Sequence, residues 1–137
     1  MTDVFSKDKR KWIMGRVKGQ DTKPEILVRS LIHRMGYRFR LHRRDLPGNP
    51  DIVLPKHRKI VFVNGCFWHG HEGCARSKRP TSNEHFWTDK LDQTQARDQR
   101  YRAELVEMGW RILTVWECEI RQRDRLLATL EDFLRET

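Results

Sequence analysis

The sequence of 137 residues has no apolar run approaching the roughly 20 residues that a membrane-spanning helix needs. Its start, Met-Thr-Asp-Val-Phe-Ser-Lys, lacks the charged and then apolar pattern of a signal peptide, so we expect a cytoplasmic protein without a membrane partner. Its three cysteines cannot all pair within one chain, which argues against a disulfide framework. No internal repeat or low-complexity segment interrupts it. We therefore expect a single domain over residues 1–137.

Basic residues are distributed unevenly along the chain. The formal net charge is +9, and residues 1–44 hold 13 Lys/Arg against 4 Asp/Glu, whereas residues 45–137 hold 15 of each. A neutral body with a basic N-terminal third is typical of a protein that binds a polyanion, because each phosphate contact releases counterions. A surface that only confers solubility is the alternative. The distribution favours nucleic acid as the partner.

Residues 1–20 are too polar for a core helix, and we expect them to form a basic N-terminal arm or helix. Lys11 and Arg16 are candidate phosphate contacts on this arm. Residues 12–14 are its one group of large apolar side chains, and Met14 could act as a wedge between bases. The alternative is that this group packs onto the core.

The remaining chain shows both helical and strand periodicity. Thr22 can cap a first helix, with Pro24 in its first turn and Glu25 completing a capping box, so Glu25 already has a structural explanation. Other boundaries follow from apolar spacing, strict alternation and turn residues. The predicted elements are helices over residues 22–35, 82–108 and 123–135 and strands over residues 37–42, 51–54, 60–63 and 110–116.

The stretch with the most reactive side chains is residues 65–74, Gly-Cys-Phe-Trp-His-Gly-His-Glu-Gly-Cys. Cys66, His71 and Cys74 lie close together in it, and Cys118 follows the predicted strand over residues 110–116. Three thiols and one imidazole make a closed tetrahedral set, which predicts structural Zn²⁺ in preference to a catalytic metal. Buried thiols without a metal are the alternative.

Two further residues are candidates for catalysis. Asp51 heads an otherwise apolar strand, where a Mg²⁺ ion would offset the cost of burying an unpaired carboxylate. Alternatively, Asp51 caps the turn after Pro50. His69 is left over once His71 is assigned to zinc, and a histidine can take a proton from water that attacks a phosphodiester. A histidine without such a role is the other interpretation.

Two pairs of adjacent aromatic residues could stack on bases. Phe67 and Trp68 cannot easily both face one core, because they are neighbours on a short loop. Aromatic side chains on a rigid loop can slide between base pairs, and the energetic cost is lower beside a mismatch. Phe86 and Trp87 form the second pair, and one of the two could belong to the core.

Several short motifs follow one another in a fixed order. They are Asp21-Thr22 with Glu25, Leu46-Pro47-Gly48-Asn49-Pro50-Asp51, Gly65-Cys66-Phe67-Trp68-His69, Phe86-Trp87, and Gly109-Trp110-Arg111 leading to Val115-Trp116-Glu117-Cys118. In order and spacing the chain resembles the bacterial very-short-patch repair endonucleases, which nick DNA beside T:G mismatches left by deamination of 5-methylcytosine. This resemblance implies an α/β (α+β) fold of the restriction-endonuclease-like class, with a mixed central β-sheet flanked by helices and a structural zinc site.

The resemblance also implies a role for each matching residue. Asp51 would hold catalytic Mg²⁺, His69 would be the general base, and Glu25 would support the active site. The remaining implied roles are structural zinc ligation by Cys66, His71, Cys74 and Cys118, and insertion beside the mismatch by Phe67, Trp68 and Trp87 from one groove and Met14 from the other. The implied partners are mismatched double-stranded DNA and a mismatch-repair matchmaker protein, with a nucleoid location when the enzyme is bound to DNA.

The sequence departs from the family at one catalytic position. The best-known members have a second active-site histidine where this chain has Asn64, which cannot titrate but can hydrogen-bond a phosphate or a water. The second acidic residue and the lysine of the wider superfamily are also missing after Asp51, so Mg²⁺ would need backbone carbonyls and water. Two alternative functions remain open: a zinc-stabilised DNA-binding module without catalysis, and a restriction-type endonuclease acting on matched duplex.

Overall fold

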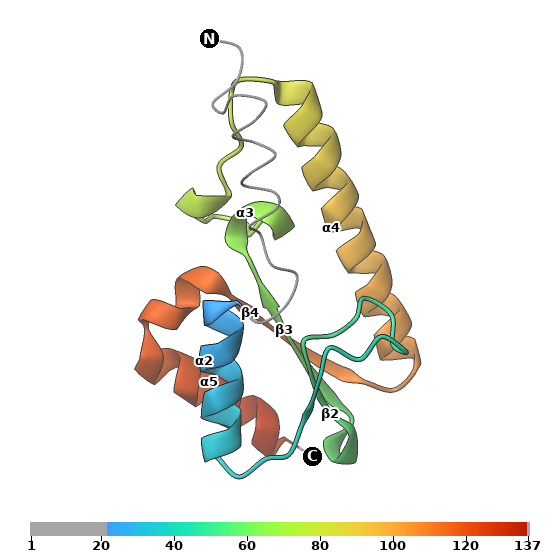
Figure 1. The fold of residues 1–137 in the computed structure, drawn as a ribbon, viewed down its shortest axis with the longest axis vertical. Helices are drawn as coiled ribbons and strands as arrows, with labels where there is room; N and C mark the ends of the chain where they lie inside the picture. Colours follow the sequence, from blue (N-terminus) through green and yellow to red (C-terminus); the bar gives the residue numbers. More distant parts are fainter. Residues whose placement is uncertain (1–21, 137) are drawn as a thin grey trace.

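The computed structural model describes residues 22–136, so the predicted arm with Lys11, Met14 and Arg16 lies outside the described residues. The helices are α2 (Lys23–Arg34), α3 (Cys66–His69), α4 (Glu84–Glu107) and α5 (Arg123–Arg135), and the strands are β1 (Arg40–Leu41), β2 (Ile52–Leu54), β3 (Lys59–Asn64) and β4 (Arg111–Trp116) (Figure 1). Short 3₁₀ turns, η1 (Pro55–His57), η2 (Ala75–Ser77) and η3 (Glu117–Arg121), connect them. No helix in this range is long and apolar enough to span a bilayer.

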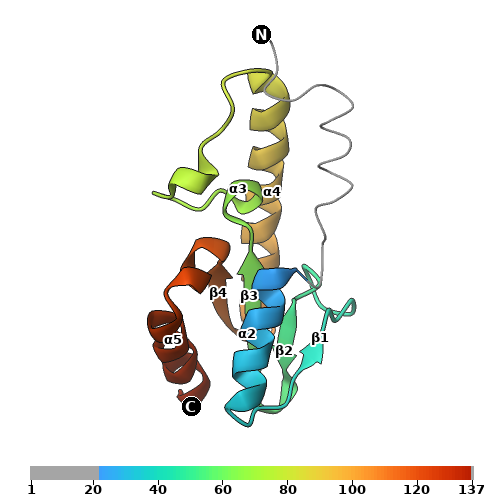
Figure 2. The same cartoon turned by 60° about the vertical axis from the view of Figure 1, so that its left-hand side comes forward.

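The four strands form one mixed sheet in the order β1-β2-β3-β4. β1 and β2 are antiparallel, as are β2 and β3, whereas β3 and β4 are parallel, with Asn64 opposite Trp116. A parallel pair needs a crossover, and here α3 and α4 supply it. The segments that follow β3 and β4, namely α3 and η3, therefore start at the same edge of the sheet (Figure 2).

Helices cover both faces of the sheet. On one face, Val28 of α2 and Leu130 of α5 pack with Ile52, Val61 and Val115. Because this face and the opposite one are both covered, strands β2 and β3 consist almost entirely of apolar residues instead of alternating. For this reason, β2 and the central part of β3 are continuous apolar runs in the sequence.

The opposite face is covered by α4. Leu105 of this helix packs with Val53, Ile60 and Trp110, all of which are buried. The mixed sheet flanked by helices confirms the predicted fold class. The N-terminal part of α4 extends beyond the sheet and runs alongside α3 (Figures 1 and 2).

Two local predictions differ from the structure. The strand predicted over residues 37–42 is confined to Arg40–Leu41, because Tyr37 and Phe39 pack against the core without pairing and His42 turns the chain with a left-handed φ of 49°. The aromatic pair expected on a loop lies instead in α3, a single helical turn that ends at Gly70. The first helix begins as predicted, since the Thr22 side chain accepts a hydrogen bond from the Glu25 backbone N–H at 3.3 Å.

Candidate active site

An open cavity of about 760 Å³ lies where β3 ends and α3 begins. It brings together side chains that are dispersed along the chain: those of α2, of the segment before β2, of the end of β3, and of α3 and α4. Among the residues predicted from sequence, those that line it are Glu25, Asp51, Asn64, Phe67, Trp68 and His69. The predicted catalytic residues and the aromatic pair therefore share one cavity.

Asp51 points from the start of β2 toward β3. Its Oδ2 accepts a hydrogen bond from the Val63 backbone N–H at 2.8 Å, a contact across the sheet and not a cap of the turn after Pro50. Burial raises the pKa of this carboxyl to about 7, although the Val63 hydrogen bond acts in the opposite direction. The negative charge of nearby Glu25 raises the pKa further. A cation at this point would relieve both effects.

Glu25 has its carboxylate on the cavity side of α2, where it is only 2% exposed. Its Oε2 lies 3.0 Å from Nη1 of Arg29, one turn further along the helix, and 2.8 Å from Nε2 of His42. Donor atoms of Glu25, His42 and Asp51 all lie within 4.8 Å of one another. The structure thus forms a three-residue cluster able to hold a metal ion.

His42 is a member of this cluster that the sequence analysis missed. Its backbone N–H donates to the Asp51 carbonyl at 3.1 Å, directly beyond the β1–β2 pair Leu41↔Ile52. The signal was present in the sequence, because an antiparallel hairpin that joins residues 37–42 to residues 51–54 through a proline-glycine turn places His42 opposite Asp51. The elements predicted from the sequence did not include a pairing of these two strands.

His69 is oriented by a residue of α4. Its Nδ1 lies 2.6 Å from Oδ2 of Asp98, and both side chains are partly exposed to the cavity. An ionised Asp98 favours the tautomer with the proton on Nδ1, which leaves Nε2 as an acceptor. Asp98 was also missed, because a carboxylate in the middle of a long polar helix carries no sequence signal of its own.

Gly70 lies at the contact between α3 and α4. Gly70 ends α3 with φ of 64°, and a Cβ at this position would lie 1.7 Å from Nε2 of Gln95, one turn before Asp98 on α4. Only glycine meets both requirements without displacing the neighbouring side chain.

Asn64 is the last residue of β3 and is 6% exposed. It lines the same cavity as Asp51 and His69, at the position where the resemblance leads one to expect a histidine. Its amide can donate and accept hydrogen bonds but cannot exchange a proton at neutral pH. His69, which lines the same cavity, has an imidazole that can exchange a proton.

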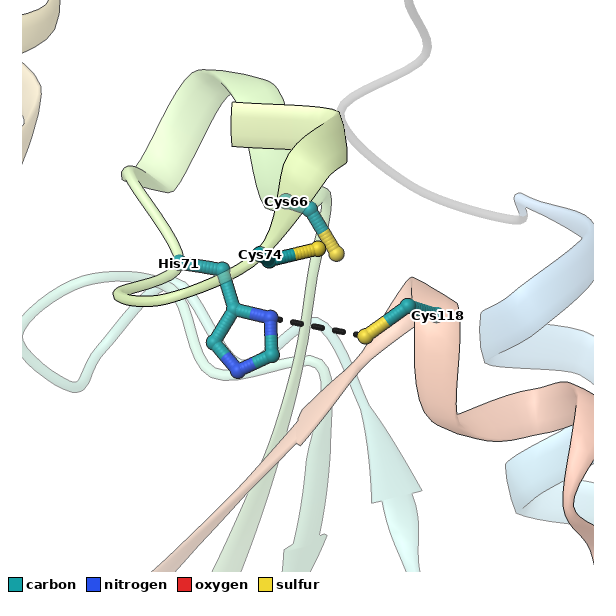
Figure 3. A group of neighbouring side chains, drawn as sticks. All are labelled: Cys66, His71, Cys74 and Cys118. Carbon is teal, nitrogen blue, oxygen red and sulfur yellow. Dashed lines mark hydrogen bonds between the residues drawn. The ribbon is translucent and has the colours of Figure 1, made fainter. Parts of the chain in front are cut away.

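The four predicted zinc ligands, Cys66, His71, Cys74 and Cys118, are brought together by the fold (Figure 3). Their ligand atoms lie within 4.8 Å of one another, and Nδ1 of His71 is 3.4 Å from Sγ of Cys118. Burial raises the pKa of the Cys66 thiol to about 12, so a thiolate there needs a neighbouring cation. Three sulfurs and one imidazole with this spacing suit a tetrahedral Zn²⁺ ion.

The cluster of Cys66, His71, Cys74 and Cys118 joins the two segments that leave the sheet at the same edge. Cys66 opens α3 directly after β3, and Cys118 lies in η3 directly after β4. The His71 ring also stacks on Trp116, with ring centroids 4.2 Å apart and an interplanar angle of 9°. A metal at this cluster would hold α3, and with it His69, in place over the end of the sheet.

An aromatic cluster lies beside the cavity. Phe67 and Trp68 of α3 both line the cavity, and their ring centroids lie 5.3 Å and 5.9 Å from that of Trp87. Trp87 is 1% exposed and its ring centroid lies 5.0 Å from that of Phe86, so Trp87 is the member of the second pair that belongs to the core, and in this structure it is not at the surface as its implied insertion beside the mismatch would require. The rings of Phe67 and Trp68 both cover that of Trp87. Trp87 therefore forms the buried support on which these two side chains pack.

Known proteins resemble this chain over most of its length. A family model described as "DNA mismatch endonuclease Vsr" matches residues 2–76. The "Type II nicking enzyme V.XorIIP" of Xanthomonas oryzae pv. oryzae is 49% identical over 134 residues, 98% of each chain. The "DNA mismatch endonuclease Vsr" of Escherichia coli is 40% identical over 126 residues, which cover 92% of this chain and 80% of that protein.

A solved structure shows the same fold. The catalytic domain of the homing endonuclease I-Bth0305I superposes with a TM-score of 0.56 at 24% sequence identity, covering 82% of this chain and 94% of that one. At this level of identity the likeness concerns the arrangement of helices and strands. It agrees with the mixed sheet and flanking helices described above.

Proposed function

The chain belongs to the DNA mismatch endonuclease Vsr family and is a DNA endonuclease, and from this premise we propose that it nicks one strand of duplex DNA beside a T:G mismatch. The mismatches in question arise by deamination of 5-methylcytosine. The observation that carries the proposal is the His69–Asp98 pair, which lies in the same cavity as Asp51 and the half-buried aromatic residues Phe67 and Trp68. The cavity therefore contains residues that can cleave a phosphodiester bond and, beside them, aromatic residues that can insert between bases.

His69 is the proposed general base. With Nδ1 directed to Asp98, its Nε2 accepts the proton of the water that attacks the scissile phosphodiester. Asp98 holds the ring in this orientation and stabilises the imidazolium that forms. Asn64 contributes hydrogen bonds to phosphate or water without taking part in proton transfer. Cleavage leaves a 5′-phosphate and a 3′-hydroxyl.

Asp51, supported by Glu25, is the proposed holder of Mg²⁺. The two carboxylates fit this cation, since they lie in one cluster and the charge of Glu25 together with burial raises the pKa of Asp51. When bound, Mg²⁺ supplies positive charge for the phosphate and the departing oxygen. Asp51 and Glu25 thereby orient the phosphate toward His69.

Phe67 and Trp68 are proposed to insert beside the mismatch. They line the cavity that contains the catalytic residues, so the inserted side chains would lie next to the phosphodiester that is cleaved. Trp87 and Phe86 act as their support, and Zn²⁺ at Cys66, His71, Cys74 and Cys118 stiffens the α3 segment that carries them. A rigid wedge lowers the entropy lost on binding.

The remaining contacts are assigned to the arm and to partners. We expect Met14 to enter from the opposite groove, with Lys11 and Arg16 on phosphates, and residues 1–137 to act as one nuclease domain. A mismatch-repair matchmaker protein is the expected associate. An enzyme with this substrate works on chromosomal DNA, so we expect it in the bacterial cytoplasm at the nucleoid.

A duplex labelled on one strand tests the proposal. The full chain with Mg²⁺ is incubated with a T:G heteroduplex, the other mismatches and the matched duplex, each in several flanking sequences. We expect a single nick beside the mismatched T and none in the matched duplex. Equal cutting of matched and mismatched DNA would support the restriction-type alternative, and binding without any nick would support the zinc-stabilised binding module.

A further inference from the structure

We propose that His42 is a nitrogen ligand of the catalytic metal site, so that the Glu25–His42–Asp51 cluster binds Mn²⁺ more tightly than Mg²⁺. The inference rests on the proposed function in placing a cation at Asp51, and it adds a third donor and a metal preference. It concerns a residue that the implied roles leave unassigned.

The spacing of the donors supports a shared ion. Nε2 of His42 and Oε2 of Glu25 are 2.8 Å apart, and the ligand atoms of all three residues lie within 4.8 Å of one another. Adjacent ligands in an octahedral shell with bonds of about 2.1 Å lie about 3 Å apart, and opposite ones about 4.2 Å. The 2.8 Å between His42 and Glu25 matches adjacent ligands of one shell, and the 4.8 Å limit for the whole cluster exceeds the separation of opposite ligands by about 0.6 Å, so small side-chain shifts would complete the shell.

The backbone holds His42 in this position. The His42 N–H donates to the Asp51 carbonyl at 3.1 Å, which continues the β1–β2 pairing by one residue. The left-handed φ of 49° then ends the strand and turns the chain there. The side chain is 17% exposed, so it is largely enclosed by protein, next to two residues that line the cavity, Glu25 and Asp51.

The donor type predicts the metal preference. Mg²⁺ takes oxygen ligands almost exclusively, whereas imidazole favours first-row transition cations. Arg29 also contacts Oε2 of Glu25 and fixes the carboxylate against the helix. If His42 only formed an ion pair with Glu25, replacing it would affect both cations alike, because its effect would act through the position of the carboxylate.

Calorimetric titration of the full-length, zinc-loaded protein with Mn²⁺ or Mg²⁺, without DNA, tests the inference. We expect His42→Gln to weaken Mn²⁺ binding by about tenfold or more, since even outer-shell partners of a metal are worth about 10–100-fold. Mg²⁺ affinity should change by less than about threefold. His33→Gln, the same replacement on the exposed surface of α2, should leave both affinities unchanged. An unchanged Mn²⁺ affinity in His42→Gln, or an equal loss for both cations, would overturn the inference.

Pulsed electron paramagnetic resonance of the Mn²⁺-loaded protein provides a readout that needs no variant. Nitrogen modulation from a directly bound imidazole should be present in the wild-type protein and in His69→Gln, and absent in His42→Gln. Its absence from the wild-type protein would refute the ligand assignment. This signal is measured without DNA, so it does not depend on nicking. If the protein shows the signal but does not nick DNA, the proposed function is overturned and the metal site is retained.

Discussion

Oδ2 of Asp98 and Nδ1 of His69 lie 2.6 Å apart, which joins the middle of α4 to the last residue of α3. Asp98→Asn should therefore slow nicking by about 100-fold, within the range that a positioned base contributes, while mismatch affinity stays constant. The amide can present its N–H to Nδ1, which favours the tautomer whose Nε2 already carries a proton. Single-turnover nicking and a separate binding assay measure the two quantities.

Asp92→Asn is the matched control, because Asp92 lies on the same helix but pairs with Arg79 at the surface. It should leave the nicking rate unchanged. An Asp98→Asn enzyme with the wild-type rate and pH profile would show that His69 needs no partner.

Asp51 makes the stability of the metal-free protein depend on pH. Burial raises its pKa from 3.8 to about 7, so between these values the folded state binds a proton that the unfolded state has released. This group's contribution to the free energy of unfolding therefore falls as pH rises from about 4 to 7 and is constant above. Asp51→Asn cannot ionise and keeps an acceptor for the Val63 N–H.

In Mg²⁺-free buffer, we expect Asp51→Asn to match the wild-type stability near pH 4 and to exceed it increasingly up to pH 7, as measured by urea denaturation. The variant should not nick DNA. Asp89→Asn, an exposed change on α4, should show no such growth with pH. A difference between Asp51→Asn and wild type that is the same at every pH would mean that Asp51 is not the titrating group.

Cys118→Ser should release zinc, because Cys118 is the ligand that connects η3 to the α3 segment. Structural zinc contributes on the order of 10 kcal/mol to the segments that it organises, so the α3 region should lose protection against proteolysis. Atomic absorption measures the metal content. Thr129→Ser, a small change on α5, should keep one zinc per chain; zinc retained by Cys118→Ser would contradict the ligand set.

Lys59 has a structural role distant from the cavity. Its side chain is 2% exposed, and Nζ donates to the carbonyls of Phe133 at 2.6 Å and Leu134 at 3.0 Å, and also to that of Glu136. It therefore caps the C-terminal end of α5 with a positive charge. Burial and the positive charge of Arg111 lower the pKa of this amine, and the negative charge of Glu136 acts in the opposite direction.

Lys59→Met should destabilise the protein by about 2–4 kcal/mol, since buried carbonyls lose a charged donor. Nicking by the folded fraction should not change. Thermal denaturation measures the first effect, and Lys56→Met on the exposed turn η1 is the control. Equal melting temperatures for Lys59→Met and wild type would show that the cap contributes nothing.

The fold was predictable to the extent that local patterns specify it. Helical spacing predicted α2, α4 and α5, and apolar runs predicted β2, β3 and β4, because both faces of these strands are covered by helices. The strand over residues 37–42 was overpredicted, since alternation in Tyr37 and Phe39 came from packing on the core and not from pairing. Alternating apolar residues indicate which side chains are buried. A side chain can be buried without its backbone pairing with a neighbouring strand.

The sequence alone determined the residue types in the site: soft ligands in one decapeptide with one distant cysteine, a carboxylate at the head of a buried strand, and a spare histidine. Only the tertiary structure decided their partners. Asp98 reaches His69 because α4 packs against α3, His42 reaches Glu25 because α2 packs against the sheet, and Trp87 is covered by Phe67 and Trp68. Each of these contacts joins segments far apart in the chain, and their positions depend on helix and strand packing, which local sequence does not encode.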